Sequence, residues 1–167
     1  MRKGDTTIGL SRRTVLGLFG AGAAATLASG RLAAAQRPEV TVYKDPSCGC
    51  CRGWAAHLQR AGFPVDVRDV PDLARIKSEL KVPVDLEACH TARIGGYVIE
   101  GHVPAAALDR LLAEGPDAWG LAVPGMPVGS PGMEGGAPER YDVVLVSRDG
   151  SRRTFMRFVG ADAQPLR

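Results

Sequence analysis

The sequence lacks long hydrophobic runs, and it lacks the motifs that most enzyme classes carry. Its uncharged N-terminal run, from Thr14 to Gly30, has 17 residues and is mostly Gly and Ala, whereas a membrane-spanning helix needs about 20 strongly apolar residues. No later segment is long and apolar enough to span a membrane. The chain also shows no Ser/His/Asp pattern, no phosphate-binding loop and no obvious carboxylate pair. Whether the protein turns over a substrate is therefore undecided from sequence.

The chain carries little net charge outside its N-terminal segment. Its 167 residues, 45% apolar and 23% charged, have the composition of one ordinary globular domain. Residues 1–35 hold five of the 21 basic side chains and one of the 18 acidic ones, which leaves a net charge of −1 on the remainder. A nucleic-acid-binding protein needs a basic face on its folded part. We therefore expect no nucleic-acid partner.

The basic N-terminal segment has the features of an export signal. The twin arginine Arg12-Arg13 directly precedes the uncharged run, and Ala33-Ala34-Ala35 follows it. The alanines form an A-x-A cleavage pattern, and the arginines resemble a twin-arginine signal, whose substrates cross the membrane already folded. We expect residues 1–35 to be a signal peptide cleaved after Ala35. Residues 36–167 would then form one domain in the periplasm, without a membrane span; an uncleaved N-terminal anchor is the alternative.

Hydrophobic periodicity and turn signals predict an α/β domain. The predicted elements are a strand at 40–43, a helix from Trp54 to Ala61, a strand at 64–70, a helix from the N-cap Asp72 to Leu80, a segment at 88–91, a hairpin of 92–94 and 97–100 around Gly95-Gly96, and a helix after Pro104 through Leu108, Leu111 and Leu112. The order β-α-β-α-β-β-α is that of the thioredoxin and glutaredoxin folds. We therefore expect a thioredoxin/glutaredoxin-like central sheet flanked by helices.

The C-terminal third is predicted to be a long loop followed by an added hairpin. Residues 115–138 hold five Pro and seven Gly, and they include Met126 and Met133 in two similar Pro-Gly-Met triplets. Segments 141–146 and 153–158 lie on either side of Asp149-Gly150, which is a hairpin signal. Met156 lies within the second of these segments, where packing is its expected role.

Three of the four cysteines are packed into four residues, Cys48-Gly49-Cys50-Cys51. Cys48 and Cys51 form a C-x-x-C pair at a predicted helix N-terminus, where the backbone N–H groups and the helix dipole favour a thiolate. Thiolates serve both disulfide exchange and soft metals, so this pair alone does not choose between them. Cys50 favours metal binding, because a third thiol would invite competing disulfides in an oxidoreductase. Cu(I), by contrast, takes two or three sulfurs, and bridging thiolates can gather several ions.

The predicted topology brings further ligands towards this cluster. In a thioredoxin-like layout the loop before the third strand lies beside the loop after the first, so Cys89 is expected next to the other cysteines. Thioethers and imidazoles also bind soft or borderline metals. His57, on the first helix between Arg52 and Arg60, is predicted to be a solvated surface residue instead. The candidate metal ligands are Cys48, Cys50, Cys51, Cys89, Met126, Met133, His90 and His102.

Several motifs of the chain recur in the order found in one known family. They are Cys48-Gly49-Cys50-Cys51 with Trp54, Cys89-His90-Thr91-Ala92, and the stretches 96–104, 120–127 and 129–133. From about Val40 to Met133 the chain resembles the CxCC-containing family of small exported metal-binding proteins related to the periplasmic copper-resistance protein CopG. The resemblance implies a thioredoxin-like fold that binds copper through the four cysteines. It also implies a role in copper tolerance, with interconversion of Cu(I) and Cu(II) as one route.

The leading hypothesis is an exported copper-binding protein that sequesters or redox-buffers copper. It would hold one or more ions, as Cu(I) or Cu(II), and its partners would be other periplasmic copper-handling proteins. One alternative is a thiol–disulfide oxidoreductase with Cys48 as nucleophile and Cys51 as resolving thiol. The others are an iron–sulfur protein, since four cysteines can hold a [2Fe–2S] cluster, and a structural zinc site.

Overall fold

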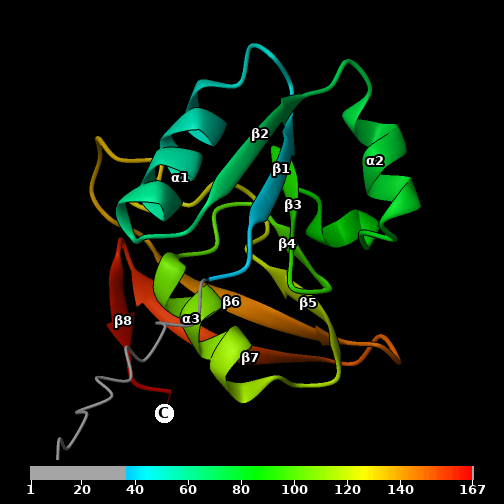
Figure 1. Cartoon of the computed structure of the whole chain (residues 1–167). Helices are drawn as coiled ribbons and strands as arrows, with labels where there is room; N and C mark the ends of the chain where they lie inside the picture. The colour runs from blue at the N-terminus through cyan, green and yellow to red at the C-terminus, as the bar shows by residue number, and fades with distance from the viewer. Residues whose placement is uncertain (1–36, 167) are drawn as a thin grey trace, which may run out of the picture. The chain divides into compact units, whose positions relative to one another are not determined.

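The computed structural model describes residues 37–166; the predicted signal peptide and its cleavage site after Ala35 lie outside these residues. No helix in the described part is long and apolar enough to cross a membrane. In chain order the elements are β1 (Val40–Lys44), α1 (Gly49–Arg60), β2 (Val65–Asp69), α2 (Leu73–Glu79), the 3-10 helix η1 (Val84–Leu86), β3 (His90–Ile94), β4 (Tyr97–Glu100), α3 (Ala105–Glu114), β5 (Ala118–Ala122), β6 (Arg140–Ser147), β7 (Arg152–Val159) and β8 (Asp162–Gln164) (Figure 1).

The strands form one mixed sheet, so the predicted α/β class is confirmed. Its order is β2-β1-β3-β4-β5-β6-β7-β8. The β1/β2 and β4/β5 pairs are parallel, and the other neighbours are antiparallel. Helices α1 and α2 lie on opposite sides of the strands β1 and β3 (Figure 1).

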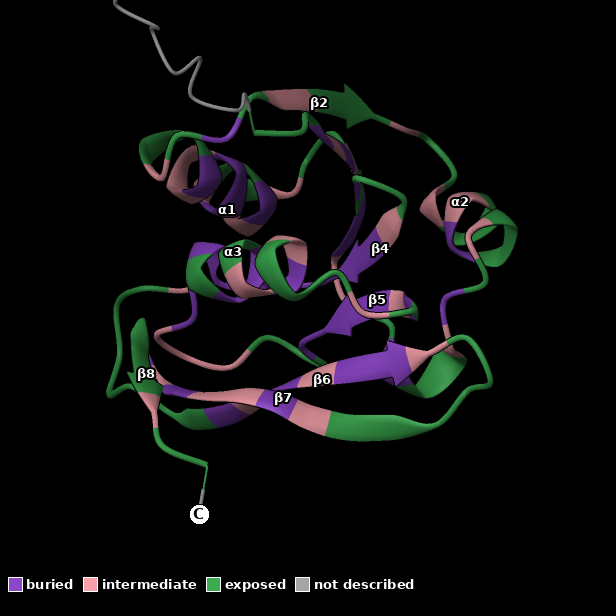
Figure 2. Cartoon of the chain, turned by 60° about the horizontal axis from the view of Figure 1, so that its bottom comes forward, coloured by how far each residue is buried: buried purple, intermediate pink, exposed green. Residues whose placement is uncertain are grey.

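The main core lies between the sheet and the helices α1 and α3. Val42 of β1 is in register with Ala92 of β3, and both are fully buried in one cluster with Trp54 of α1 and Leu108 of α3. Because side chains alternate along a strand, the neighbouring positions face the other side of the sheet, which α2 covers. Figure 2 shows the buried residues of α1 and α3 on the sides that face the sheet. Burial of each large apolar side chain contributes about 1.5–3 kcal/mol.

Local sequence signals set the ends of several elements as predicted. The hairpin between β3 and β4 turns at Gly95 and Gly96, which have φ angles of 52° and 91°. A two-residue hairpin turn with both φ angles positive strongly favours glycine. Asp72 caps α2, since its carboxylate accepts a hydrogen bond from the N–H of Arg75 at 2.9 Å.

The predicted loop at 115–138 is wrong in its first part, which forms strand β5. This strand pairs with β4 and β6. Its central residue, Gly120, has the backbone of Val98 where a Cβ would lie. The glycine that indicates a loop in the sequence is therefore required by a close approach of two strands. The irregular segment runs from 123 to 139. The short strand β8 has no counterpart among the predicted elements.

The two strands on either side of Asp149 and Gly150 are β6 and β7, which pair antiparallel. Phe155 and Phe158 of β7 are fully buried in the main core. Arg110 of α3 lies over the ring of Phe155 and donates a hydrogen bond to its carbonyl oxygen at 2.8 Å. Half-buried Met156 also packs against this core. These strands therefore extend the sheet and cover α3.

Candidate metal centre

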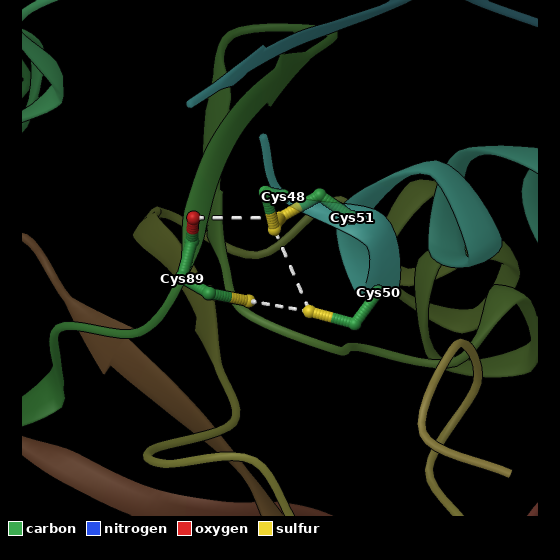
Figure 3. A group of neighbouring side chains, drawn as sticks. All are labelled: Cys48, Cys50, Cys51 and Cys89. Atoms are coloured by element: carbon green, nitrogen blue, oxygen red, sulfur yellow. Dashed lines mark hydrogen bonds between the residues drawn. A yellow bond between two sulfur atoms is a disulfide. The ribbon is translucent and has the colours of Figure 1, made fainter. Parts of the chain in front are cut away.

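The four cysteines meet where α1 begins beside the start of β3. Cys48 is the N-cap of α1, and Cys50 and Cys51 lie in its first turn. The Sγ atom of Cys50 lies 3.5 Å from that of Cys48 and 3.7 Å from that of Cys89 (Figure 3). The structure thus places Cys89 beside the cluster, as the topology predicts.

Two of these cysteines form a disulfide, and two are free thiols. Cys48 and Cys51 are joined with their Cα atoms 5.5 Å apart, whereas Cys50 and Cys89 are unpaired. The bond spans one helical turn, so it connects no distant parts of the fold. It is the two-electron oxidised form of the C-x-x-C pair.

Two buried histidines lie beside Cys89. Its Sγ atom is 3.0 Å from Nε2 of His102 and 3.4 Å from Nδ1 of His90. Nδ1 of His102 donates a hydrogen bond to the carbonyl oxygen of Pro131 at 2.7 Å, so Nε2 carries the lone pair that faces the sulfur. Nε2 of His90 is buried and has no hydrogen-bond partner among the described residues. Leaving such a buried nitrogen without a partner costs about 1–3 kcal/mol, whereas the other ring nitrogen, Nδ1, faces the sulfur of Cys89.

The electrostatics of the site favour neutral ligands in the metal-free protein. Burial lowers the pKa of both histidines, and the neighbouring His102 lowers that of His90 further. Burial, together with neighbouring Cys50, raises the pKa of the Cys89 thiol to about 12. Neutral imidazole is the form that binds metals. An ion entering here would have to displace the proton of Cys89.

The irregular segment 123–139, which carries Met126 and Met133, packs on α1 at Gly132, the residue before Met133. A Cβ at Gly132 would lie 2.5 Å from the carbonyl oxygen of Cys50 and 2.7 Å from the nitrogen of Trp54, so the loop packs directly on the first turns of α1. Half-buried Met133 follows this contact, whereas Met126 is 52% exposed on the surface. The contact at Gly132 therefore supports Met133 more strongly than Met126 as a ligand.

A buried carboxylate that was not predicted from the sequence holds the segment around Cys89. Glu100 accepts hydrogen bonds from the N–H of Ala88 at 2.6 Å and from the hydroxyl of Thr91 at 2.7 Å. Buried Lys77 of α2 pairs with the same carboxylate and donates to Thr91 at 3.0 Å. Ala88 and Thr91 flank Cys89 and His90 in the chain. Glu100 could have been noticed in the sequence as the single acidic residue at the end of the apolar strand 97–100. No sequence signal indicates the role of Lys77.

Two side chains of α1 hold the segment that follows His102. Nε1 of Trp54 donates a hydrogen bond to the carbonyl oxygen of Val103 at 2.8 Å, and the N–H of Ala105 donates to Nε2 of His57 at 3.0 Å. The prediction of a solvated His57 is therefore wrong. Its face of α1 is turned towards the start of α3, and burial lowers the pKa of its imidazole.

Replacing Trp54 with phenylalanine is expected to lower the free energy of unfolding by about 1–3 kcal/mol, because the buried carbonyl of Val103 loses its partner. Chemical denaturation of the metal-free protein measures the change. Trp119 provides the matched control, since its Nε1 donates to the carbonyl of Leu80 from a half-buried position. Trp119→Phe should cost less than Trp54→Phe; equal costs would contradict the importance of the buried contact.

The chain is similar to proteins of known structure over most of its length. A search of curated protein sequences gives no match. Residues 86–133 match a family described as "Protein of unknown function, DUF411". The solved structure "Copper resistance protein copG- Form 2" is 42% identical with a TM-score of 0.68, covering 77% of this chain and 99% of that one. "Copper resistance protein copG- Form 1" is 43% identical with a TM-score of 0.69, covering 74% and 99%.

The family match includes the segment from Leu86 to Met133 that carries Cys89, His90 and His102. The cysteines at positions 48, 50 and 51 lie outside that segment and meet Cys89 in space. Sequence identity above 40% over almost the full length of the solved chains, together with this cysteine cluster, establishes the relationship. The chain belongs to the family of the copper resistance protein CopG.

Proposed function

We propose that the protein is an exported copper-binding protein that sequesters or redox-buffers copper and contributes to copper tolerance. The observation that carries this proposal is the gathering of Cys48, Cys50, Cys51 and Cys89, whose sulfur atoms all lie within 4.8 Å of one another. Thiolates are soft ligands suited to Cu(I). The similar solved structures are titled copper resistance protein. The twin-arginine segment supports the periplasm as the compartment.

The fold proposed for residues 37–114 is thioredoxin-like. The order β1-α1-β2-α2-β3-β4-α3 and the sheet order β2-β1-β3-β4 support it. In this layout the C-x-x-C pair begins α1, and the segment before β3 approaches it from the neighbouring strand. Strands β5 to β8 would then be additions to that unit.

The proposed ligands are the four cysteines with His90 and His102, and Met133 and Met126 as further sulfur donors. The sulfur and imidazole atoms around Cys89 form a second group within 4.8 Å. Reduction of the Cys48–Cys51 disulfide would make all four thiols available. Bridging thiolates would allow more than one Cu(I) ion.

The C-x-x-C pair also gives the site a source of electrons. Oxidation of the two thiols to the disulfide releases two electrons and two protons, and two Cu(II) ions would each accept one electron to become Cu(I). This balance is the chemical form that redox buffering would take. The same disulfide favours a second candidate function, thiol–disulfide exchange with Cys48 as nucleophile and Cys51 as resolving thiol.

A combined metal and thiol count of the protein, purified anaerobically, tests the proposal. We expect at least one equivalent of copper per chain, with free thiols recovered when the copper is removed. Iron with a brown colour would indicate an iron–sulfur protein instead. Zinc whose removal unfolds the domain would indicate a structural zinc site. Disulfide reduction by the metal-free protein, lost in Cys48→Ser, would favour the oxidoreductase.

Replacing Cys89 with serine is expected to lower the number of copper ions bound per chain, because Cys89 faces both Cys50 and His102. Elemental analysis of the variant after copper loading measures the number. Thermal unfolding of the metal-free variant shows whether it remains folded. An unchanged copper content in a folded Cys89→Ser variant would contradict its role as a ligand.

A further inference from the structure

We propose that closing the Cys48–Cys51 disulfide leaves a smaller copper site, formed by Cys50, Cys89 and His102, that holds one Cu(I) ion. The inference rests on the proposed function and adds a redox control to it. Oxidation of the C-x-x-C pair would lower the copper capacity of the protein without reducing it to zero. Oxidation would remove Cys48 and Cys51 as ligands, whereas Cys50, Cys89 and His102 would still bind copper.

Cys50 is free to face Cys89 while its neighbour Cys51 is joined to Cys48. Successive residues of a helix point about 100° apart, so Cys50 and Cys51 differ in direction. Cys51 is fully buried, whereas Cys50 is half-buried. In Figure 3 the sulfur of Cys50 points towards Cys89 and also lies beside the disulfide, 3.5 Å from the sulfur of Cys48. Formation of the disulfide therefore leaves the facing pair Cys50 and Cys89 in place.

The spacing of the two free sulfurs suits a shared ion. Their Sγ atoms are 3.7 Å apart. Two thiolates that bind one ion at about 2.3 Å each, with an angle of about 109–120° between the bonds, lie roughly 3.8–4.0 Å apart. A metal ion can therefore bridge Cys50 and Cys89 with little movement of either side chain.

The third ligand is already oriented. Nε2 of His102 is 3.0 Å from Sγ of Cys89, at hydrogen-bond distance, and an ion would replace the proton between these two atoms. The opposite nitrogen donates to the carbonyl of Pro131, which fixes both the tautomer and the ring orientation. Gly132 packs this loop on α1. None of these contacts involves Cys48, so they hold with the disulfide closed.

The oxidation step balances with a small disulfide such as oxidised glutathione as the oxidant. The thiolates of Cys48 and Cys51 give up two electrons and form a new S–S bond, while the S–S bond of glutathione accepts the two electrons and breaks into two thiolates. Copper is neither oxidised nor reduced. Ions that depended on Cys48 and Cys51 lose those ligands, and one ion keeps Cys50, Cys89 and His102.

The experiment compares Cu(I) binding by two forms of the protein. One is fully reduced; the other is oxidised anaerobically with oxidised glutathione and shown by alkylation and mass spectrometry to keep two free thiols. Both are titrated with Cu(I) against a chromophoric Cu(I) chelator. We expect one equivalent in the disulfide form and more than one in the reduced form. A Cys48→Ser, Cys51→Ser double variant should bind one equivalent without any oxidation.

Variants identify the ligands of the remaining ion. Cys89→Ser, or alkylation of Cys50 and Cys89 in the disulfide form, should abolish binding by that form. His102→Gln should weaken it at least tenfold, because glutamine can still donate to the carbonyl of Pro131 but offers no imidazole. Met156→Leu, in β7, changes a sulfur outside the cluster and should alter neither form.

The outcomes separate the two proposals. If the reduced protein binds no Cu(I), the proposed function is wrong. If the reduced protein binds Cu(I) but the disulfide form binds none, or both forms bind equally, the remaining site is overturned while the function stands. Full affinity in His102→Gln would overturn the assignment of its third ligand.

Discussion

Replacing Lys77 with methionine is expected to lower the free energy of unfolding of the metal-free protein by about 3–5 kcal/mol, because it leaves the buried carboxylate of Glu100 without its counter-charge. The side chains of Lys77 and Glu100 are 6% and 0% exposed. Glu100 also accepts from Ala88 and Thr91, on either side of Cys89 and His90. The substitution should therefore loosen the segment that carries these two residues. Urea unfolding measures the loss of stability.

The matched control is Arg157→Met in the C-terminal hairpin. Asp142 accepts from Arg157 and from Thr154, the same combination of cation and threonine, but its side chain is 33% exposed. Solvent screens that pair, so its loss should cost at most about 1 kcal/mol. The double variant Lys77→Met, Glu100→Gln removes both charges and should recover part of the stability. A cost for Lys77→Met no greater than that for Arg157→Met would contradict the buried pair.

The Lys77→Met defect is also expected to depend on pH. Burial raises the pKa of Glu100 above its usual 4.5, and Lys77 opposes that rise, so removing Lys77 raises the pKa further. When a carboxyl has a higher pKa in the folded protein than in the unfolded chain, the folded protein loses stability as pH rises above the pKa of the unfolded chain. The difference from the parent protein should shrink towards pH 4 and grow towards neutral pH.

Replacing Gly132 with alanine is expected to lower the free energy of unfolding by about 2–5 kcal/mol, from backbone strain and steric overlap together. Gly132 has a φ angle of 90°, and the added Cβ would lie 2.5 Å from the carbonyl oxygen of Cys50. The obstacle is helix backbone, which cannot move aside as a flexible side chain would. The loop should therefore lift from α1 and weaken the contact between Pro131 and His102. Unfolding curves measure the stability loss.

Gly125→Ala measures the cost of backbone strain without steric overlap. Gly125 lies in the same loop with a φ angle of 71°, but nothing lies within 4 Å of the position that an alanine Cβ would occupy there. Left-handed backbone at alanine costs about 1–2 kcal/mol, so this variant should lose less stability. Similar losses in Gly125→Ala and Gly132→Ala would show that the packing of the loop on α1 contributes little.

Elements defined by local chemistry could be predicted from the sequence. Gly95 and Gly96 specify their turn through backbone conformation, and Asp72 caps α2 through its own side chain. Strand β5 could not be predicted, because Gly120 indicates a loop unless the neighbouring strand is known. The carbonyl of Val98 that excludes a side chain there comes from β4, 22 positions earlier, and local patterns carry no information about such an approach.

The candidate site also has a part that could be predicted from the sequence and a part that could not. The position of Cys89 beside Cys50 follows from the order of the elements, so the sequence was sufficient for it. The pairing of Lys77 with Glu100 joins residues 23 positions apart and depends on how α2 lies on the sheet. The partial burial of His57 depends likewise on where α3 begins. Packing between helices and strands determines the positions of these side chains, and the hydrophobic periodicity of the sequence does not encode that packing.

Because the proposed ligands are far apart in the sequence, the order in which the chain is synthesised and folds determines when a metal ion can first bind. Cys50, Cys89, His102 and the carbonyl of Pro131 belong to four separate stretches that meet only after β1, β3, β4 and the following loop have assembled. A nascent chain that ends before Pro131 has no acceptor to orient His102. In small zinc domains the metal drives the chain to fold. In this chain the four groups meet only in the assembled fold, so copper bound by all of these ligands would report that folding is complete.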